Sequence, residues 1–205
     1  MDKMKVCDQV KCSDFPCTDT DKASYNMPDV EINPSRIKVV MITEAPPNDK
    51  ADYFYANGTP FYLQTTMQAF SDAGFSVSNM PDILNLGVYV TTAIKCGKTQ
   101  YAISLNTIKN CLRLLETEIN LFPNVKAYLL GGDVAIKAMN YIWGKQTGKR
   151  VIPAGSTYKI RKQQYYYNGR RVFPSYTPAG KNFLIEKSKR RMVAEDIRDA
   201  LKLAG

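Results

Sequence analysis

Apolar runs alternate with segments of helical periodicity along this 205-residue chain. Three short, largely apolar runs have the character of buried strands, and they cover residues 36–43, 87–95 and 125–132. Apolar residues recur at helical spacing in four other segments, which predicts helices over residues 61–74, 104–121, 133–143 and 186–203. Ser104 and Asp133 are the expected N-terminal caps of the second and third of these helices.

A further strand is expected within residues 151–176, which have the pattern of a hairpin with its turn at Asn168 and Gly169. Strands that alternate with helices pair in parallel, because each crossover helix covers a face of the sheet. The expected fold class is therefore α/β, a three-layer α/β/α sandwich around a short, mainly parallel four-stranded sheet. Ligands of such sheets bind beyond the carboxyl ends of the strands.

Residues 1–35 differ from the rest of the chain, since they are acidic, hold three of the five cysteines and show no sustained hydrophobic period. We interpret them as an N-terminal arm held in place by something other than a hydrophobic core, and residues 36–205 as the main domain. No run approaches the roughly 18 apolar residues of a membrane span. We therefore expect a cytoplasmic monomer that has no membrane partner.

Basic side chains are strongly segregated along the chain. Its formal net charge is +9, and residues 134–185 contain ten basic and no acidic side chains. Four tyrosines share this segment, namely Tyr158, Tyr165, Tyr166 and Tyr167. Cations contact phosphates and aromatic rings stack on bases, so the segment is a candidate nucleic-acid surface. A solvated basic face on a hairpin is the alternative interpretation.

The chain contains no histidine. This excludes the Ser-His-Asp and Cys-His nucleophile systems, and it removes the most common general base and metal ligand. Any catalysis must depend on carboxylates, thiolates, hydroxyls, amides or cations.

Five cysteines are present, Cys7, Cys12, Cys17, Cys96 and Cys111. Two of the first three could converge with Cys96, which ends a predicted strand, and Cys111, which lies in the next predicted helix. Four thiolates suit either a 4Fe–4S cluster or a structural zinc ion, and their spacing does not distinguish the two. Cys96 and Cys111 could instead be small buried apolar residues.

Six short motifs follow one another in a fixed order. They are TEAPP (43–47), GTPF (58–61), VYVTTAIKC (88–96), Cys111, LLGGDVA (129–135) and VFPSYTPA (172–179). Together they resemble the uracil-DNA glycosylase superfamily, and most closely its iron–sulfur branch, family 4. The resemblance extends from about residue 36 to residue 201. It implies the fold of that superfamily and a function in base excision repair of DNA damage.

The resemblance also implies a metal site. In the iron–sulfur branch, two N-terminal cysteines, the cysteine that ends the Lys-Cys strand and a helix cysteine bind a 4Fe–4S cluster. By position these ligands are Cys12, Cys17, Cys96 and Cys111, with Cys7 as the alternative to either of the first two. Zinc is the alternative occupant.

Residue roles at the DNA site are likewise implied by position. The flipped base would stack on Phe61 above the loop of Glu44 and Ala45, and Glu44 would support the water or the oxocarbenium ion. Thr92 and Thr177 occupy the positions at which the family has an Asn that reads the base and a His that supports the leaving base. A group of basic residues would contact DNA phosphates, namely Lys181, Lys187, Lys189, Arg190 and Arg191.

The two threonines leave the substrate open. A threonine hydroxyl offers no positive charge for the leaving base and no paired donor and acceptor for a uracil edge. The expected activity is hydrolysis of the N-glycosidic bond of uracil or another damaged base in single- or double-stranded DNA. The alternative is a catalytically reduced iron–sulfur protein that binds DNA.

Overall fold

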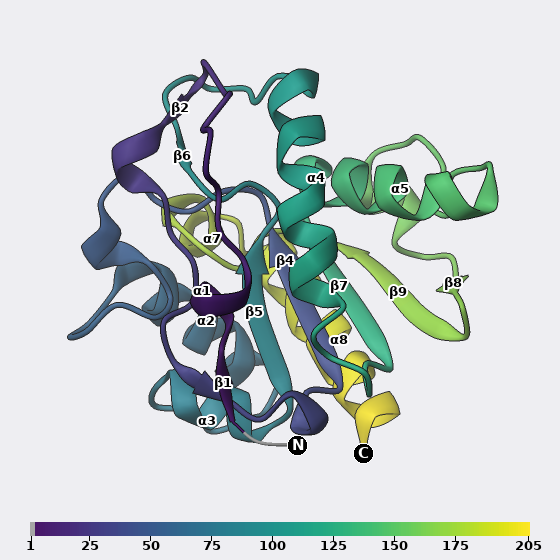
Figure 1. The fold of residues 1–205 in the computed structure, drawn as a ribbon. Coiled ribbons are helices and arrows are strands. Elements are labelled where there is room, and N and C mark those ends of the chain that lie inside the picture. The colour runs from purple at the N-terminus through teal and green to yellow at the C-terminus, as the bar shows by residue number, and fades with distance from the viewer. Residues whose placement is uncertain (1–2) are drawn as a thin grey trace.

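The computed structural model describes residues 3–205, and a five-stranded sheet forms its centre (Figure 1). The strands, in their order across the sheet, are β5 (Val88–Thr92), β4 (Val39–Thr43), β7 (Ala127–Gly131), β9 (Arg170–Ser175) and β8 (Tyr165–Tyr167). The first four are parallel, and β8 pairs with β9 in the antiparallel sense. The α/β class and the mainly parallel sheet are thus confirmed.

One strand more is present than the four expected. The hairpin turn adds it, because Asn168 and Gly169 both have positive φ, 47° and 75°, and return the chain alongside β9. The first part of the predicted hairpin is not a strand, since it contains the short helix α6 (Thr157–Ile160). Ser, Gly and Pro residues in this part break the alternation that a strand would need.

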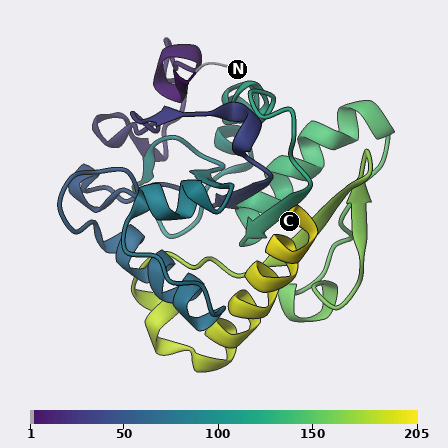
Figure 2. The same cartoon turned by 90° about the horizontal axis from the view of Figure 1, so that it is seen from below.

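Helices cover both faces of the sheet, as the three-layer prediction requires. One face packs against α4 (Leu105–Ile119) and α5 (Asp133–Thr147), and the other against α2 (Phe61–Asp72), α3 (Met80–Asn85) and α8 (Lys187–Ala204). Strand β4 alternates between these cores, since Val40 and Ile42 belong to the first and Val39 and Met41 to the second. Figure 2 shows α8 beside α2 on one side of the sheet.

The helix caps agree with the sequence in one case and differ in the other. The Ser104 hydroxyl accepts a hydrogen bond from the Thr107 N–H, as an N-terminal cap does. The cap of α5 is Gly132, with φ of 101°, and not Asp133. Asp133 is the first helical residue and forms an ion pair with Lys137 one turn later.

The N-terminal arm is attached more extensively than the sequence indicated. It contains β1 (Met4–Lys5), α1 (Val6–Gln9), β2 (Thr20–Asp21), β3 (Glu31–Ile32) and the 3-10 turns η1 (Lys22–Ser24) and η2 (Pro34–Arg36). Strand β2 pairs with β6 (Gly97–Lys98). The expectation that the arm lacks core contacts is wrong, because Val6, Val10 and Ile32 are buried in the core beneath α4.

Two short elements complete the fold, η3 (Lys50–Asp52) and α7 (Lys181–Ile185). Among residues 3–205, no helix combines the length and the apolar character needed to cross a membrane.

Candidate functional site

A cavity of about 550 Å³ opens at the carboxyl ends of the parallel strands. Each of three strands delivers residues to it. Glu44 and Ala45 follow β4, Gly132 follows β7, and Thr177 follows β9. The parallel sheet therefore brings together side chains that lie more than a hundred residues apart in sequence.

Glu44 is half-buried and lies directly against Gly132. A Cβ atom at position 132 would lie only 2.6 Å from Oε1 of Glu44 and 2.9 Å from its Cγ. Gly132 also has a φ of 101°, which other residues rarely adopt. Glycine is thus needed here twice, for the backbone at the start of α5 and for the space that the Glu44 side chain fills.

The two predicted threonines differ in their placement. Thr177 lines the cavity, but its hydroxyl donates a hydrogen bond of 2.7 Å to the carbonyl of Gly131. Thr92 is completely buried, does not line the cavity, and donates to the carbonyl of Ile94 at 2.6 Å. Both hydroxyl protons are therefore directed to main-chain carbonyls, and Thr92 lies away from the space in which a base could bind.

The aromatic lining also differs from the prediction. Phe61, the first residue of α2, is half-buried and is not among the residues that line the cavity. The next residue, Tyr62, does line it, together with Tyr176 and Phe183. Burial raises the pKa of Tyr62, and the nearby charges of Asp52 and Glu44 raise it further. Its phenol is therefore neutral at neutral pH and can donate a hydrogen bond.

Three amide side chains, those of Asn48, Gln100 and Asn182, line the same cavity. Each offers both a donor and an acceptor, which is what recognition of a base edge requires. None of the three was predicted, because they lie in connections or in the short α7, where no periodicity marks them. Two motifs end directly before a missed residue, TEAPP before Asn48 and GTPF before Tyr62.

Two of the five predicted DNA-binding cations reach the cavity. Lys181 and Lys189 line it, and Lys189 pairs with Glu186 at 2.7 Å. The other three, Lys187, Arg190 and Arg191, line a separate depression. Arg190 forms a bidentate ion pair with Asp72 on α2, with its Nε at 3.0 Å and its Nη2 at 2.8 Å from one carboxylate oxygen. This guanidinium joins α8 to α2.

Part of the basic segment 134–185 is also internal. Arg161 pairs with Asp196 at 2.7 Å, and the guanidinium of Arg171 lies 4.4 Å from the centre of the Phe173 ring. Tyr165 and Tyr167 are buried. The ten cations therefore do not form one continuous surface, and those near the cavities are the candidates for contact with an anion.

A second, much smaller cavity is lined by four cysteines, Cys12, Cys17, Cys96 and Cys111. Cys7 lies elsewhere, with its thiol 3.5 Å from a carboxylate oxygen of Asp29. The structure thus brings together one of the ligand sets that the sequence left open. As the side chains stand, residues 3–205 contain no group of three or more His, Cys, Asp or Glu residues arranged to hold a metal ion.

The donor chemistry of this cavity suits a soft metal centre. Burial raises the pKa of Cys96 to about 12 and that of Cys111 to about 11, and the neighbouring cysteines add to both shifts. A cation between the thiols would relieve this mutual repulsion. The buried Thr20 hydroxyl, which also lines the cavity, has no hydrogen-bond partner among the described residues and could donate to a sulfur atom.

Comparisons with known proteins agree with the observed fold. The family model described as "Uracil DNA glycosylase superfamily" matches residues 30–201. The type-5 uracil-DNA glycosylase of Thermus thermophilus is 27% identical over 124 residues, which are 60% of this chain and 54% of that protein. The chain therefore spans about half the length of the curated relative it matches. The predicted superfamily is confirmed, and this relative carries the type-5 name where the motifs indicated family 4.

Proposed function

Because the chain belongs to the uracil-DNA glycosylase superfamily, we propose that it hydrolyses the N-glycosidic bond of uracil or another damaged base in DNA. The observation that carries this proposal is the position of Glu44, which is held against Gly132 at the carboxyl ends of the strands and lines a cavity with aromatic and amide walls. A carboxylate is the one ordinary general base that this histidine-free chain can place there.

The chemistry follows from the charges that develop. The bond between C1′ and the base nitrogen breaks with its electron pair on the base, and water adds its oxygen to C1′. Glu44 stabilises the positive sugar and accepts the proton of this water. The neutral phenol of Tyr62 donates a hydrogen bond to the departing base. Thr177 cannot do so while its hydroxyl donates to the carbonyl of Gly131.

The base is held by stacking and by amides. Phe61 is proposed as the stacking partner, as the resemblance implies, and its cavity-lining neighbour Tyr62 is the competing candidate. Phe61→Ala separates them, because it removes the ring of Phe61 and leaves the ring of Tyr62. Tyr62→Phe keeps the ring and tests only the O–H. Loss of a stacked ring weakens binding by about 1–3 kcal/mol. We expect Phe61→Ala to raise KM, and Tyr62→Phe to lower kcat.

DNA contacts are proposed at the rim of the cavity. Lys181 lines it, and α7 also exposes Leu184 and Ile185 beside that lysine, the latter with 74% of its surface accessible. An exposed apolar residue flanked by cations suits contact with bases on one side and phosphates on the other. The other three cations, Lys187, Arg190 and Arg191, are weaker candidates because they line a separate depression. Arg190 is also paired with Asp72.

A 4Fe–4S cluster is proposed at the four cysteines, with zinc as the alternative. Cys12 and Cys17 come from the arm, Cys96 follows β5, and Cys111 lies on α4, so the group would cross-link three parts of the chain. Its contribution when bound would be structural. Brown protein with about four ligated thiols would support the cluster, and colourless protein with stoichiometric zinc would refute it.

The deciding experiment is incubation with single- and double-stranded oligonucleotides that carry uracil, hypoxanthine, xanthine or an alkylated base, followed by detection of abasic sites. We expect Glu44→Gln to reduce product formation by about 10²-fold or more. Glu116→Gln is the matched control, since Glu116 is also half-buried but lies on α4, outside the cavity. Equal rates for both variants would refute the role of Glu44.

A DNA-binding protein without excision activity is the second candidate function. It is favoured by the hydroxyls of Thr92 and Thr177, which both donate to main-chain carbonyls and leave the cavity without the family's Asn and His. Retained DNA binding with no abasic product from any lesion would select this alternative.

A further inference from the structure

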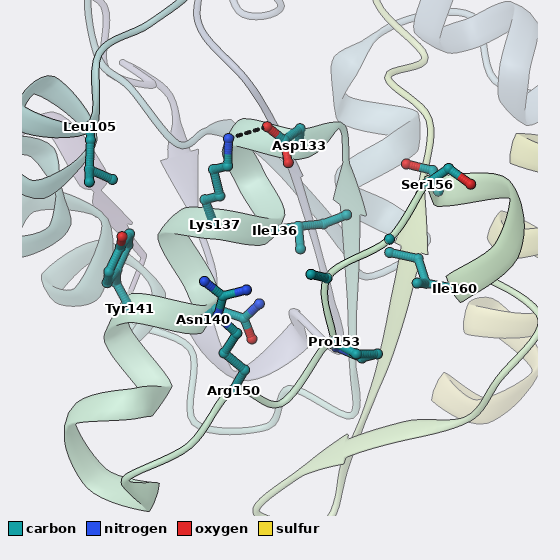
Figure 3. A pocket seen from close by; sticks show the side chains of 13 residues that line it. Leu105, Asp133, Ile136, Lys137, Asn140, Tyr141, Arg150, Pro153, Ser156 and Ile160 are labelled. Carbon is teal, nitrogen blue, oxygen red and sulfur yellow. Dashed lines mark ion pairs between the residues drawn. The ribbon is translucent and has the colours of Figure 1, made fainter.

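A third cavity, of about 610 Å³, lies outside the site described above (Figure 3). It is formed by α5, the first residue of α4 and the connection of residues 150–160. Its volume falls in the range of about 300–1,000 Å³ that is typical of small-molecule sites. The proposed base-excision chemistry uses none of its lining residues.

The cavity has a rigid wall. Asn140 on α5 accepts hydrogen bonds from the N–H groups of Val151 and Ile152, both at 3.0 Å, and donates to the carbonyl of Ile152 at 2.9 Å. These three bonds fasten the 150–160 connection to α5. They hold the start of the connection beside α5 and so fix one wall of the cavity.

Its lining suits a flat ligand with an anionic group. Ile136 and Ile160 provide buried apolar surface, and the ring of Tyr141 stands at the side. Two cations line the cavity, Lys137 and Arg150. Lys137 is paired with Asp133, the acidic residue of this lining. Arg150 is exposed and forms no ion pair within residues 3–205, so its charge is available to a ligand.

This cavity and the cavity of Glu44 are neighbours. Gly132 lines the cavity of Glu44, and the next residue, Asp133, lines this one. A second segment also runs between them, since Gln100 lines the first cavity and Leu105 the other. On this segment stands Tyr101, which has 97% of its surface exposed. An exposed ring at such a junction is a surface on which a base can stack.

We propose that this third cavity binds a nucleotide of the same DNA strand that carries the target base, a few positions away from it. The base lies against Ile136, Ile160 and Tyr141, and its phosphate pairs with Arg150. This inference rests on the proposed function, because the strand is guided to the cavity by the target base bound beside Glu44. It adds a second contact between the protein and the DNA, and this contact depends on the strand and not on the damaged base.

The test measures binding of fluorescent oligothymidylates of about three and about twelve nucleotides, each with one uracil as the target base and the longer one within the usual range of single-strand sites. Arg150→Gln removes the phosphate contact, and Ala154→Trp fills the cavity from an exposed position. The controls are Arg36→Gln and Ser76→Trp, at exposed positions that precede the amino ends of β4 and β5. Thermal unfolding checks that all variants fold.

We expect both cavity variants to weaken binding of the longer oligonucleotide by about tenfold, as loss of one charge-assisted contact does. Binding of the short oligonucleotide should not change, and Arg150→Gln should lower the salt slope by about 0.7. A 4-thiothymidine placed at successive positions should cross-link to the 141 or 150–160 region at one preferred distance from the target.

Wild-type binding of both oligonucleotides with no effect of either cavity variant would overturn this inference and leave the proposed function intact. Failure of the wild-type protein to bind either one, together with no excision, would remove the proposed function itself. A third outcome is saturable binding of free thymidine monophosphate, abolished by Ala154→Trp while oligonucleotide binding is unchanged. It would assign the cavity to a free nucleotide and refute the strand contact.

Discussion

Gly132→Ala is the most direct test of how the fold places Glu44. The new Cβ would lie 2.6 Å from Oε1 of the carboxylate, well inside contact distance, so the Glu44 side chain must move. Displacement of a reacting group by about 1 Å can lower a rate by about 10²-fold. The backbone conformation of Gly132 adds strain of about 1–3 kcal/mol for a residue with a side chain.

Strain and displacement can be separated by Gly148→Ala, at the other end of the same helix. Gly148 also has a positive φ, 70°, but a Cβ there would meet no atom within 4 Å. Both variants should lower the melting temperature by a few degrees, at about 2–4 °C per kcal/mol for a chain of this size. Only Gly132→Ala should lose excision activity, measured as kcat/KM at a temperature where both variants are folded.

The double variant Gly132→Ala with Glu44→Ala is the internal check. Alanine at position 44 lacks the Cγ, Cδ and Oε1 atoms that the new Cβ would meet, so the double variant should be more stable than Gly132→Ala alone. The reasoning would be refuted if Gly132→Ala kept wild-type kcat/KM, or if Gly148→Ala lost the same activity.

Three further predictions concern other buried groups. Cys96→Ser should abolish the metal content measured by elemental analysis, whereas Cys7→Ser should retain it, because Cys96 lines the cysteine cavity and Cys7 does not. Glu118→Gln should destabilise the protein to urea by about 3–5 kcal/mol, since it leaves the buried charge of Lys95 without its partner. Burial raises the pKa of Asp196. At pH values between the pKa of the unfolded state and that of the folded state, the folded protein therefore binds a proton that the unfolded chain has released. Stability should therefore fall as pH rises from the ordinary aspartate pKa through the raised one, and Asp196→Asn should remove this slope in urea unfolding at successive pH values.

The elements predicted most accurately are those whose periodicity is dictated by burial. Strands β4, β5 and β7 are buried at every residue, and the short runs without charged residues that this requires are visible in the sequence. The arm was misjudged for the opposite reason. Its buried residues, among them Val6 and Val10, are too few and too irregularly spaced to form a period, although the core beneath α4 encloses them.

The site was predicted where strand ends position it and missed where loops do. Glu44 and Thr177 follow strands whose parallel order fixes their meeting point, and both line one cavity. Asn48, Gln100 and Asn182 reach the same space through connections whose conformation depends on tertiary contacts. No local pattern encodes such contacts, which is why the amides that line the cavity were absent from the prediction.

Thr92 and Thr177, which stand at the family's Asn and His positions, have a structural role. Each donates to a main-chain carbonyl at a strand end, Thr92 to Ile94 after β5 and Thr177 to Gly131 at the end of β7. At these positions the side chains stabilise the frame of the cavity, and the neutral polar side chains left to meet a substrate include those of Tyr62, Asn48, Gln100 and Asn182. Loops and the short α7 can shift more easily than strands. The choice of lesion should therefore depend on residues that sequence motifs do not mark, whereas Glu44, the carboxylate proposed to act on the bond, is fixed by the sheet.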